Sequence, residues 1–262
     1  MMRGKSFWIP AVLVLLVFGC GGGEDNPAGP GDGDTEETLK IVSIFPADGS
    51  VQVGEQVEIM IQFDRPVEQV GAIMVPDLKW MDEDWLLRSE DGTTFSRTVA
   101  LEEEMVYQMI VFGAVGTDST YLSEATMIAF TTSDVLPEGA ISGTVETPNS
   151  YSAEGTVLLL VDATHWLPEY GFGGNSPEDY LVAFGFVSDG TGAYRISHVR
   201  AGNYYLYAFK DSGADGVVEE GKDLFGFYDI TGLSGLIPIR VYAGAETTDI
   251  DFPVLQGSSF FD

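Results

Sequence analysis

Apolar and polar residues alternate in short runs along most of the chain, and this pattern predicts β-strands. The clearest run extends from Val57 to Phe63, where Val57, Ile59, Ile61 and Phe63 fall on one face of an extended strand. Further strand-like runs are Val106 to Val111, Met127 to Thr132, Gly155 to Val161, Val182 to Val187 and Tyr204 to Phe209. Short strands separated by turn residues predict an all-β fold built from antiparallel sandwiches.

Turn and linker residues divide these strands into two modules in series. The first occupies 39–134, the segment 135–139 (Val-Leu-Pro-Glu-Gly) has the composition of a hinge, and the second occupies 140–255 before a short tail at 256–262. Within the second module, the sequence Asp-Gly-Thr-Gly at 189–192 predicts a hairpin turn that leads into a strand beginning at Ala193.

The first 19 residues have the pattern of an export signal. Arg3 and Lys5 precede an apolar run at 7–18, which is shorter than the roughly 20 residues of a membrane span. Val-Phe-Gly-Cys at 17–20 resembles the lipobox of bacterial lipoproteins, which implies cleavage before Cys20 and a lipid anchor on its thiol. The alternatives are an uncleaved anchor or an ordinary cleaved signal. Because Cys20 is the single cysteine, no intramolecular disulfide can form.

The segment 20–38 follows as an acidic Gly/Pro-rich stretch with almost no apolar side chain, so we expect a flexible linker. The residue after Cys20 is glycine rather than aspartate. In Gram-negative lipoproteins, that resemblance implies delivery to the outer membrane. The sequence leaves open whether the modules face the periplasm or the cell exterior.

The first module carries three stretches with a family resemblance. Phe45-Pro46, the run from Ile61 to Val67, and Phe-Thr-Thr at 130–132 resemble the bacterial Ig-like domain of S-layer and other envelope proteins. The resemblance implies a spacer or adhesive domain without catalytic residues. It also implies that Phe63 and Phe130 fill the core, and that Pro46 and Pro66 set turns.

The second module resembles a different family. Its stretches 141–145, 189–196 and 199–205 are similar to carboxypeptidase regulatory-like, transthyretin-like domains. Members are small Greek-key sandwiches that accompany enzymes, transporters or surface proteins, and they are not enzymes themselves. The stretch 164–179 is an insertion that this pattern does not explain.

Charge narrows the classes of partner. The chain has 41 acidic and 12 basic residues, a formal net charge of −29. A field of that sign repels phosphate backbones, so we expect no nucleic acid partner. It is compatible with cation binding and also with a merely solvated acidic surface.

One acidic loop is a candidate calcium site. The stretch 211–223 resembles the Asp-x-Asn-x-Asp-Gly loops that related domains carry at this point, which makes Asp211, Asp215, Glu219 and Asp223 candidate ligands. Gly213 stands where a further oxygen ligand is expected, and a lysine stands where a bidentate glutamate is expected. The alternative is a polar turn that binds no ion, and no other cofactor is expected.

Tryptophans are the candidates for sugar binding. Trp80 and Trp85 bracket three acidic residues and Trp166 lies in the insertion, so all three are candidate ligand-binding residues, with half-buried packing as the alternative. His165 and His198 have no partner at ligand spacing, and no Gly-x-Ser-x-Gly motif is present.

We therefore predict a lipid-anchored, non-enzymatic envelope protein with a binding, adhesive or structural role. Alternatives are a carbohydrate-binding lipoprotein, and an accessory lipoprotein that docks to an envelope complex. The expected partners are the membrane, through the lipid anchor, and an envelope protein or polysaccharide.

Overall fold

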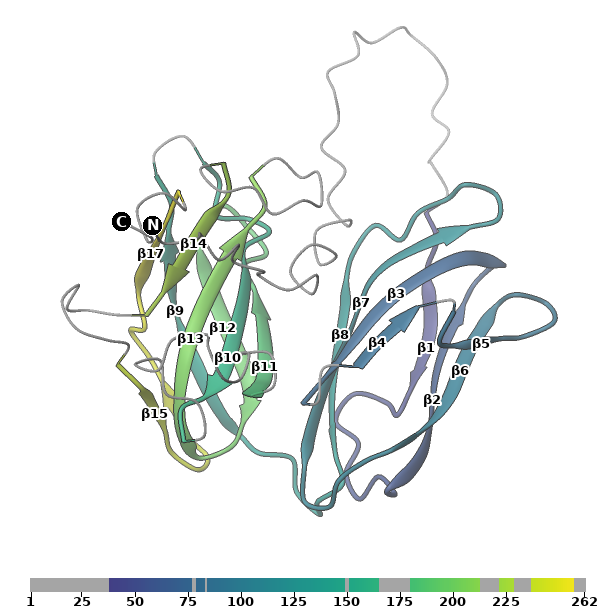
Figure 1. The fold of residues 1–262 in the computed structure, drawn as a ribbon, viewed down its shortest axis with the longest axis horizontal. Coiled ribbons are helices and arrows are strands. Elements are labelled where there is room, and N and C mark those ends of the chain that lie inside the picture. Colours follow the sequence, from purple (N-terminus) through teal and green to yellow (C-terminus); the bar gives the residue numbers. More distant parts are fainter. Residues whose placement is uncertain are drawn as a thin grey trace, which may run out of the picture.

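The computed structural model describes residues 38–76, 79–82, 84–148, 151–164, 180–212, 222–228 and 237–256. The strand elements in these ranges confirm the predicted all-β fold class. They form two groups that lie side by side, and the chain passes from the first group to the second between β8 and β9 (Figure 1). Within these ranges, no helix has the length and apolar character that a membrane span requires.

The first module is a sandwich of two antiparallel four-stranded sheets. One sheet has the order β1-β2-β6-β5 and the other has the order β4-β3-β7-β8. The strands are β1 (Ile41–Phe45), β2 (Gln56–Phe63), β3 (Val67–Val75), β4 (Lys79–Asp82), β5 (Leu87–Arg88), β6 (Thr94–Ala100), β7 (Val106–Gly116) and β8 (Thr126–Thr131).

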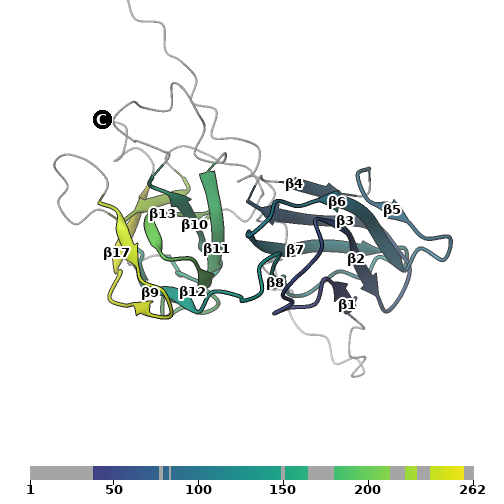
Figure 2. The ribbon, with the colours of Figure 1, turned by 90° about the horizontal axis from the view of Figure 1, so that it is seen from below.

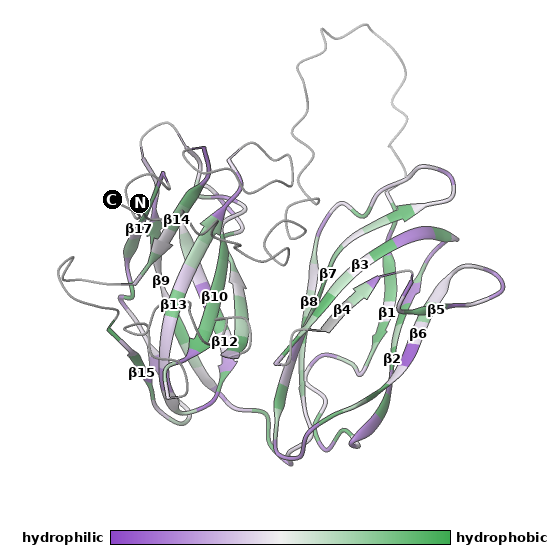
Figure 3. Ribbon diagram, viewed as in Figure 1, coloured by the Kyte–Doolittle hydropathy of each residue, from purple (hydrophilic) through white to green (hydrophobic). Residues whose placement is uncertain are grey.

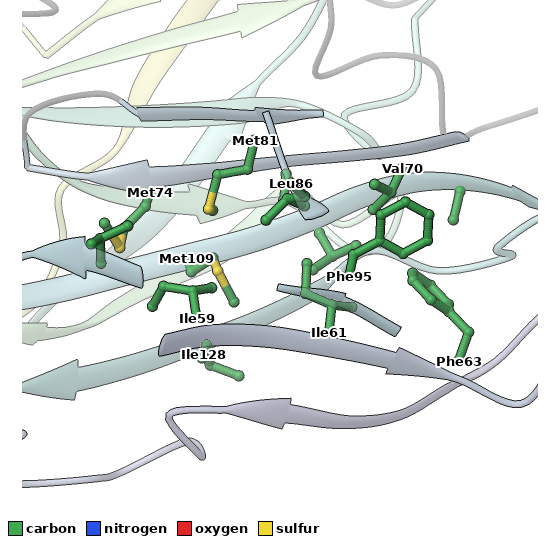
Figure 4. Packing of buried hydrophobic residues seen from close by; sticks show 14 of the residues in the cluster. Ile59, Ile61, Phe63, Val70, Met74, Met81, Leu86, Phe95, Met109 and Ile128 are labelled. Carbon is green, nitrogen blue, oxygen red and sulfur yellow. The ribbon is translucent and has the colours of Figure 1, made fainter. Parts of the chain in front are cut away.

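The core of this module lies between its two sheets. The apolar face predicted for β2 is buried, and the side chains of Phe63 and Phe130 are only 2% and 0% exposed, which confirms their expected place in the core. Figure 4 shows Ile59 and Ile61 of one sheet facing Met109 of the other. Because alternate residues of a strand point to opposite faces, one side of each sheet supplies this core.

The second module has nine strands in one hydrogen-bonded network. They are β9 (Gly139–Glu146), β10 (Val157–Asp162), β11 (Leu181–Phe186), β12 (Ala193–Val199), β13 (Gly202–Lys210), β14 (Leu224–Phe227), β15 (Ile239–Val241), β16 (Glu246–Thr247) and β17 (Phe252–Gln256). The main path is β11-β10-β13-β14-β17-β9-β12, with β15 paired to β13 and β16 to β9. Most pairs are antiparallel, while β9 pairs in parallel with β16 and β17.

The hairpin predicted at 189–192 is wrong, although the turn itself is present. The Asp189 carboxylate accepts a hydrogen bond from the Thr191 backbone N–H at 2.8 Å, and Gly192 adopts a φ of +79°. However, β11 pairs with β10 and β12 pairs with β9, so the turn joins strands that are not partners. The physical reason is that the Val145 N–H of β9 bonds the Gly192 carbonyl oxygen, so β9 pairs with the chain as it leaves the turn.

Candidate functional site

Several residues that the sequence marks as candidate sites lie outside the described residues. These are Cys20 with the linker as far as residue 37, Asp215 and Glu219 of the acidic loop, and Trp166 of the insertion. Trp80 lies on β4, but its side chain is also outside what the structure describes.

Asp211 and Asp223 lie at the two ends of the acidic loop. β13 pairs with β14 through Lys210 and Leu224, so the residues next to that pair are brought together. Both carboxylates are buried, with side chains 7% and 2% exposed, and Asp223 accepts a hydrogen bond from the Ser212 N–H at 3.0 Å. Over the part of the chain that the structure describes, no group of three or more His, Cys, Asp or Glu side chains could hold a metal ion.

Trp85 does not present a free ring for sugar stacking. The side chain is half-buried against the first core, and the Arg97 guanidinium carbon lies 4.6 Å from the ring centre. The backbone N–H of Trp85 also donates to the Asp82 carboxylate at 2.9 Å, which fixes the backbone of this turn. The geometry therefore favours a packing role for Trp85 over a carbohydrate platform.

The two modules meet at a buried junction that centres on β7. Along this strand, Tyr107, Met109 and Val111 point into the first core, while Gln108, Ile110 and Phe112 point toward the second module. A separate buried cluster joins the modules. Its members are Ile73, Val75, Ile110 and Phe112 from the first module and Val157, Val161, Leu181, Phe184 and Tyr205 from the second.

A glycine makes room for the largest side chain that the first module contributes to this cluster. A Cβ atom on Gly71 of β3 would lie 2.7 Å from the Phe112 ring, which is closer than carbon atoms can approach. The missing side chain at Gly71 therefore lets the Phe112 ring lie close against β3, where it is 6% exposed. Strands β3, β7, β10 and β11 face one another across the junction in the second view (Figure 2).

Gln108 closes an open edge of the second module. Its side-chain Nε2 donates to the Ser197 carbonyl oxygen of β12 at 3.0 Å, and its Oε1 accepts from the Phe184 N–H of β11 at 2.8 Å. β11 and β12 are the two ends of the hydrogen-bonded path and do not pair with each other, so we call their boundary the β11–β12 seam. The Gln108 side chain is 2% exposed, so both of these bonds are made away from solvent.

Residues of the expected hinge are tied to the second module as well. Gly139 belongs to β9 and pairs with Val199, whose carbonyl oxygen would lie 2.3 Å from a Cβ atom on that glycine. The Pro137 carbonyl oxygen is 3.1 Å from Nδ1 of His198, so the ring nitrogen donates this bond. His198 therefore has a structural contact with the hinge segment 135–139.

The junction was missed by the sequence reasoning, although part of its signal is visible. Residues 106–112 (Val-Tyr-Gln-Met-Ile-Val-Phe) are apolar on both faces of the strand, and a strand with two apolar faces is covered on both sides. The role of Gln108 has no such signal, because its partners are backbone atoms more than 70 residues away in the sequence.

A second boundary between sheet edges lies in the first module. β1 and β8 are edge strands of opposite sheets, and a groove of about 400 Å³ lies between them, which we call the β1–β8 groove. Its lining is Ile41, Val42, Ser43, Ile44, Ala47, Asp48, Thr126 and Ile128.

A network of charges fixes the chain at one end of this groove. The Lys40 N–H donates to the Asp64 carboxylate at 3.0 Å, and Arg65 bridges Asp64 and Asp118 at 3.1 and 3.3 Å. The Arg65 guanidinium lowers the pKa of Asp64, and hydrogen bonds from Thr120 lower the pKa of Asp118. These pairs lie at the surface, so they orient the start of β1 more than they stabilise the fold.

No protein-family model matches the sequence, and no curated protein matches it. Among solved structures, the chain resembles the Bacillus anthracis TIE protein at 10% identity and a TM-score of 0.26, covering 86% of this chain and 42% of that one. It also resembles the major pilin subunit of Bacillus cereus at 10% identity and a TM-score of 0.25, covering 84% and 70%. The N-terminal part of the bacterial S-layer protein SbsC is similar at 13% identity and a TM-score of 0.26, covering 79% and 44%.

These neighbours include a pilin subunit and an S-layer protein. The chain spans less than half the length of the TIE protein. With TM-scores below 0.3, the similarities assign no activity, substrate or partner to this chain.

Proposed function

We propose that this chain is a lipid-anchored envelope protein whose two β modules act together as one non-catalytic binding or structural unit. The proposal includes a bacterial Ig-like domain as the first module and a carboxypeptidase regulatory-like domain as the second. The observation that carries it is the junction: a buried apolar cluster and the two hydrogen bonds of Gln108 join the modules into one body. A unit of this kind holds a fixed shape at the end of a long linker, which suits a role in spacing or docking.

The lipobox at Cys20 supports the anchoring part of the proposal. Two or more acyl chains give a stable anchor, whereas a single chain gives a marginal one. The test is membrane fractionation of cells that express the full chain or its Cys20→Ser variant, with metabolic labelling by a palmitate analogue. We expect labelled protein in the membrane fraction for the full chain, and unlabelled protein outside that fraction for the variant. Equal membrane retention of both proteins would contradict lipid anchoring.

The side of the membrane that the modules face is tested by protease treatment of intact cells. Loss of an epitope near Asp262, with a periplasmic control protein left intact, would favour a surface role in adhesion. Protection until the outer membrane is permeabilised would favour docking to a periplasmic partner. Between the alternatives, the Arg97 contact on Trp85 weighs against carbohydrate capture at that ring and leaves protein docking as the better-supported one.

Calcium at the loop 211–223 remains part of the proposal. The support from the structure is that Asp211 and Asp223 lie buried at the two ends of that loop. If calcium binds there, millimolar calcium raises the melting temperature of the full chain by mass action, and Asp211→Ala removes the increase. An Asp189→Ala variant, altered in a turn elsewhere in the module, keeps the increase. No calcium-dependent shift in the full chain would refute this part.

A further inference from the structure

The β1–β8 groove is bounded by two sheet edges rather than by helices or loops. Among the described strands, β1 pairs with β2 alone and β8 pairs with β7 alone, so the other edge of each strand borders the groove. An edge strand presents a row of backbone N–H and C=O groups that a further strand can pair with.

One part of the outward edge of β8 is already hydrogen-bonded within the chain. These bonds show which part of that edge is open. Ala129 N–H donates to the Asp48 carboxylate at 2.9 Å, and its carbonyl oxygen accepts from the Gly49 N–H at 2.8 Å. Two residues on, Thr131 pairs with Ser50 and Val53. Alternate residues of a strand turn their backbone groups to the same edge, so Met127 also turns its N–H and C=O outward. Over the described part of the chain, the backbone bonds along this edge begin at Ala129.

Apolar side chains are concentrated around this opening. Nine large apolar side chains are exposed over the residues that the structure describes, and five of them come from the segments 42–51 and 121–127 that border the groove. They are Val42, Phe45, Val51, Tyr121 and Met127. Figure 3 shows apolar residues along β1, which is an edge strand of its sheet. An apolar edge with unpaired backbone is a surface to which an extended segment can add.

Charge identifies what kind of segment fits. The groove is lined by Asp48, and Glu124 lies two residues before its Thr126 wall, while Lys40 is the single base in the segments 38–53 and 121–128. The whole chain carries a net charge of −29. A second copy of the chain would bring the same charge, and the acidic linker at 21–37 has almost no apolar side chain to fill the groove.

We propose that the β1–β8 groove binds an extended segment of a partner protein, which adds as a strand beside β1 and Met127 of β8. The segment alternates apolar and polar side chains, and its polar side chains are neutral or basic. This inference rests on the proposed function, because it names the docking surface and the kind of partner for the non-catalytic unit.

The test uses the mature chain from residue 20 onward with Cys20→Ser, so that no lipid is needed. Two nine-residue peptides serve as probes: each alternates valine and threonine, and one has lysine at both ends while the other has glutamate. Binding is followed by calorimetry and by hydrogen–deuterium exchange. We expect saturable binding of the lysine peptide, at least tenfold weaker binding of the glutamate peptide, and slower exchange in β1 and β8.

Variants at exposed positions separate the groove from the rest of the sheet. Val42 is 59% exposed on β1, and Leu87 is 71% exposed on β5 at the opposite edge of the same sheet. Val42→Gln should lower the affinity for the lysine peptide at least fivefold, while Leu87→Gln should leave this affinity unchanged. Both variants should fold, because neither removes a buried side chain.

Three outcomes would overturn the inference. The first is no saturable binding of the lysine peptide at millimolar concentration. The second is equal weakening by Val42→Gln and Leu87→Gln. The third is a concentration-dependent dimer of the unmodified mature chain that Val42→Gln abolishes, which would assign the groove to a second copy. None of these results bears on the palmitate labelling, so failure of this inference is distinct from failure of lipid anchoring.

Discussion

In the part of the chain that the structure describes, the β11–β12 seam and the β1–β8 groove are both places where the edges of β-sheets meet without pairing, and the chain treats them differently. At the β11–β12 seam, the side chain of Gln108 from the other module bonds both edges, and an apolar cluster adjoins them. At the β1–β8 groove, the backbone bonds along the outward edge of β8 begin at Ala129 over the residues that the structure describes, and apolar side chains such as Val42 and Phe45 are about half exposed.

The difference shows how covering an edge strand of a sandwich prevents it from pairing with another chain. Where another part of the chain covers the edge, as Gln108 and the apolar cluster do, the edge is buried and hydrogen-bonded to that cover. Where it does not, the same kind of edge displays unpaired backbone and apolar surface, which in proteins marks a site for another strand. The first kind of edge stabilises the fold, and the second is available for binding.

The largest expected effect comes from removing an aromatic side chain from the buried cluster that joins the modules. Phe112→Ala deletes a ring that is 6% exposed and leaves the space over Gly71 empty. We expect the free energy of unfolding to fall by about 3–5 kcal/mol, as for other buried phenylalanines. Guanidinium denaturation of the mature chain measures this, and the separation of one unfolding transition into two would show that the modules had been uncoupled.

The control for that variant is Leu87→Ala, at an exposed position of an edge strand. Its free energy of unfolding should stay within about 0.5 kcal/mol of the unmodified chain. If Phe112→Ala cost no more than this control, the junction would contribute little to stability and the proposed rigid unit would be wrong.

A smaller effect is expected at Gln108. Gln108→Leu keeps most of the side-chain volume but leaves the Phe184 N–H and the Ser197 carbonyl oxygen without these partners. Each buried group left unbonded costs about 1–3 kcal/mol, and burial of the apolar leucine side chain offsets part of that cost, so we expect a net loss of about 2–4 kcal/mol. Hydrogen exchange provides a second readout, because the Phe184 amide should exchange faster in the variant.

The matched control is Gln62→Leu on β2, where the glutamine side chain accepts one bond from the Ser43 hydroxyl and is half-buried. A loss of about 1 kcal/mol or less is expected there, since water can replace the bond. Equal losses at the two positions would mean that Gln108 is an ordinary surface contact.

The smallest effect on the free energy of unfolding is expected at the β1–β8 groove. Phe45 is 49% exposed on β1, so Phe45→Ser removes little buried surface. The free energy of unfolding should change by less than about 0.5 kcal/mol, while affinity for the lysine peptide falls. A loss of stability comparable with that of Phe112→Ala would show that this edge is already covered within the chain.

The sequence predicted the strands better than their connections. Period-two patterns such as that of β2 report burial directly, so the all-β class and the buried face that includes Phe63 followed from them, while the core position of Phe130 was implied by the resemblance to Ig-like domains. The turn at 189–192 was found, but the partner of the strand after it was not. Turn residues determine how the chain bends, whereas β9 determines where β12 pairs, and that contact is separated by about 50 residues.

The two sheet boundaries were harder to predict for the same reason. Phe112 and Ile110 could have been recognised from the double apolar pattern of β7, but the partner surface on β10 and β11 could not. The β1–β8 groove depends on where segment 49–53 stops pairing with β8, and no local pattern encodes that. Of the candidate site residues, the structure brings Asp211 and Asp223 together and gives Trp85 a packing role.

The placement of Gln108 also has an evolutionary consequence. A self-sufficient domain can be copied, shuffled or fused elsewhere at its linker and still fold. Here the residue that closes the second module is encoded in the first, about 30 residues before the hinge segment 135–139. Recombination at 135–139 would separate a sheet from the side chain that completes it, so these two modules are best inherited as a pair.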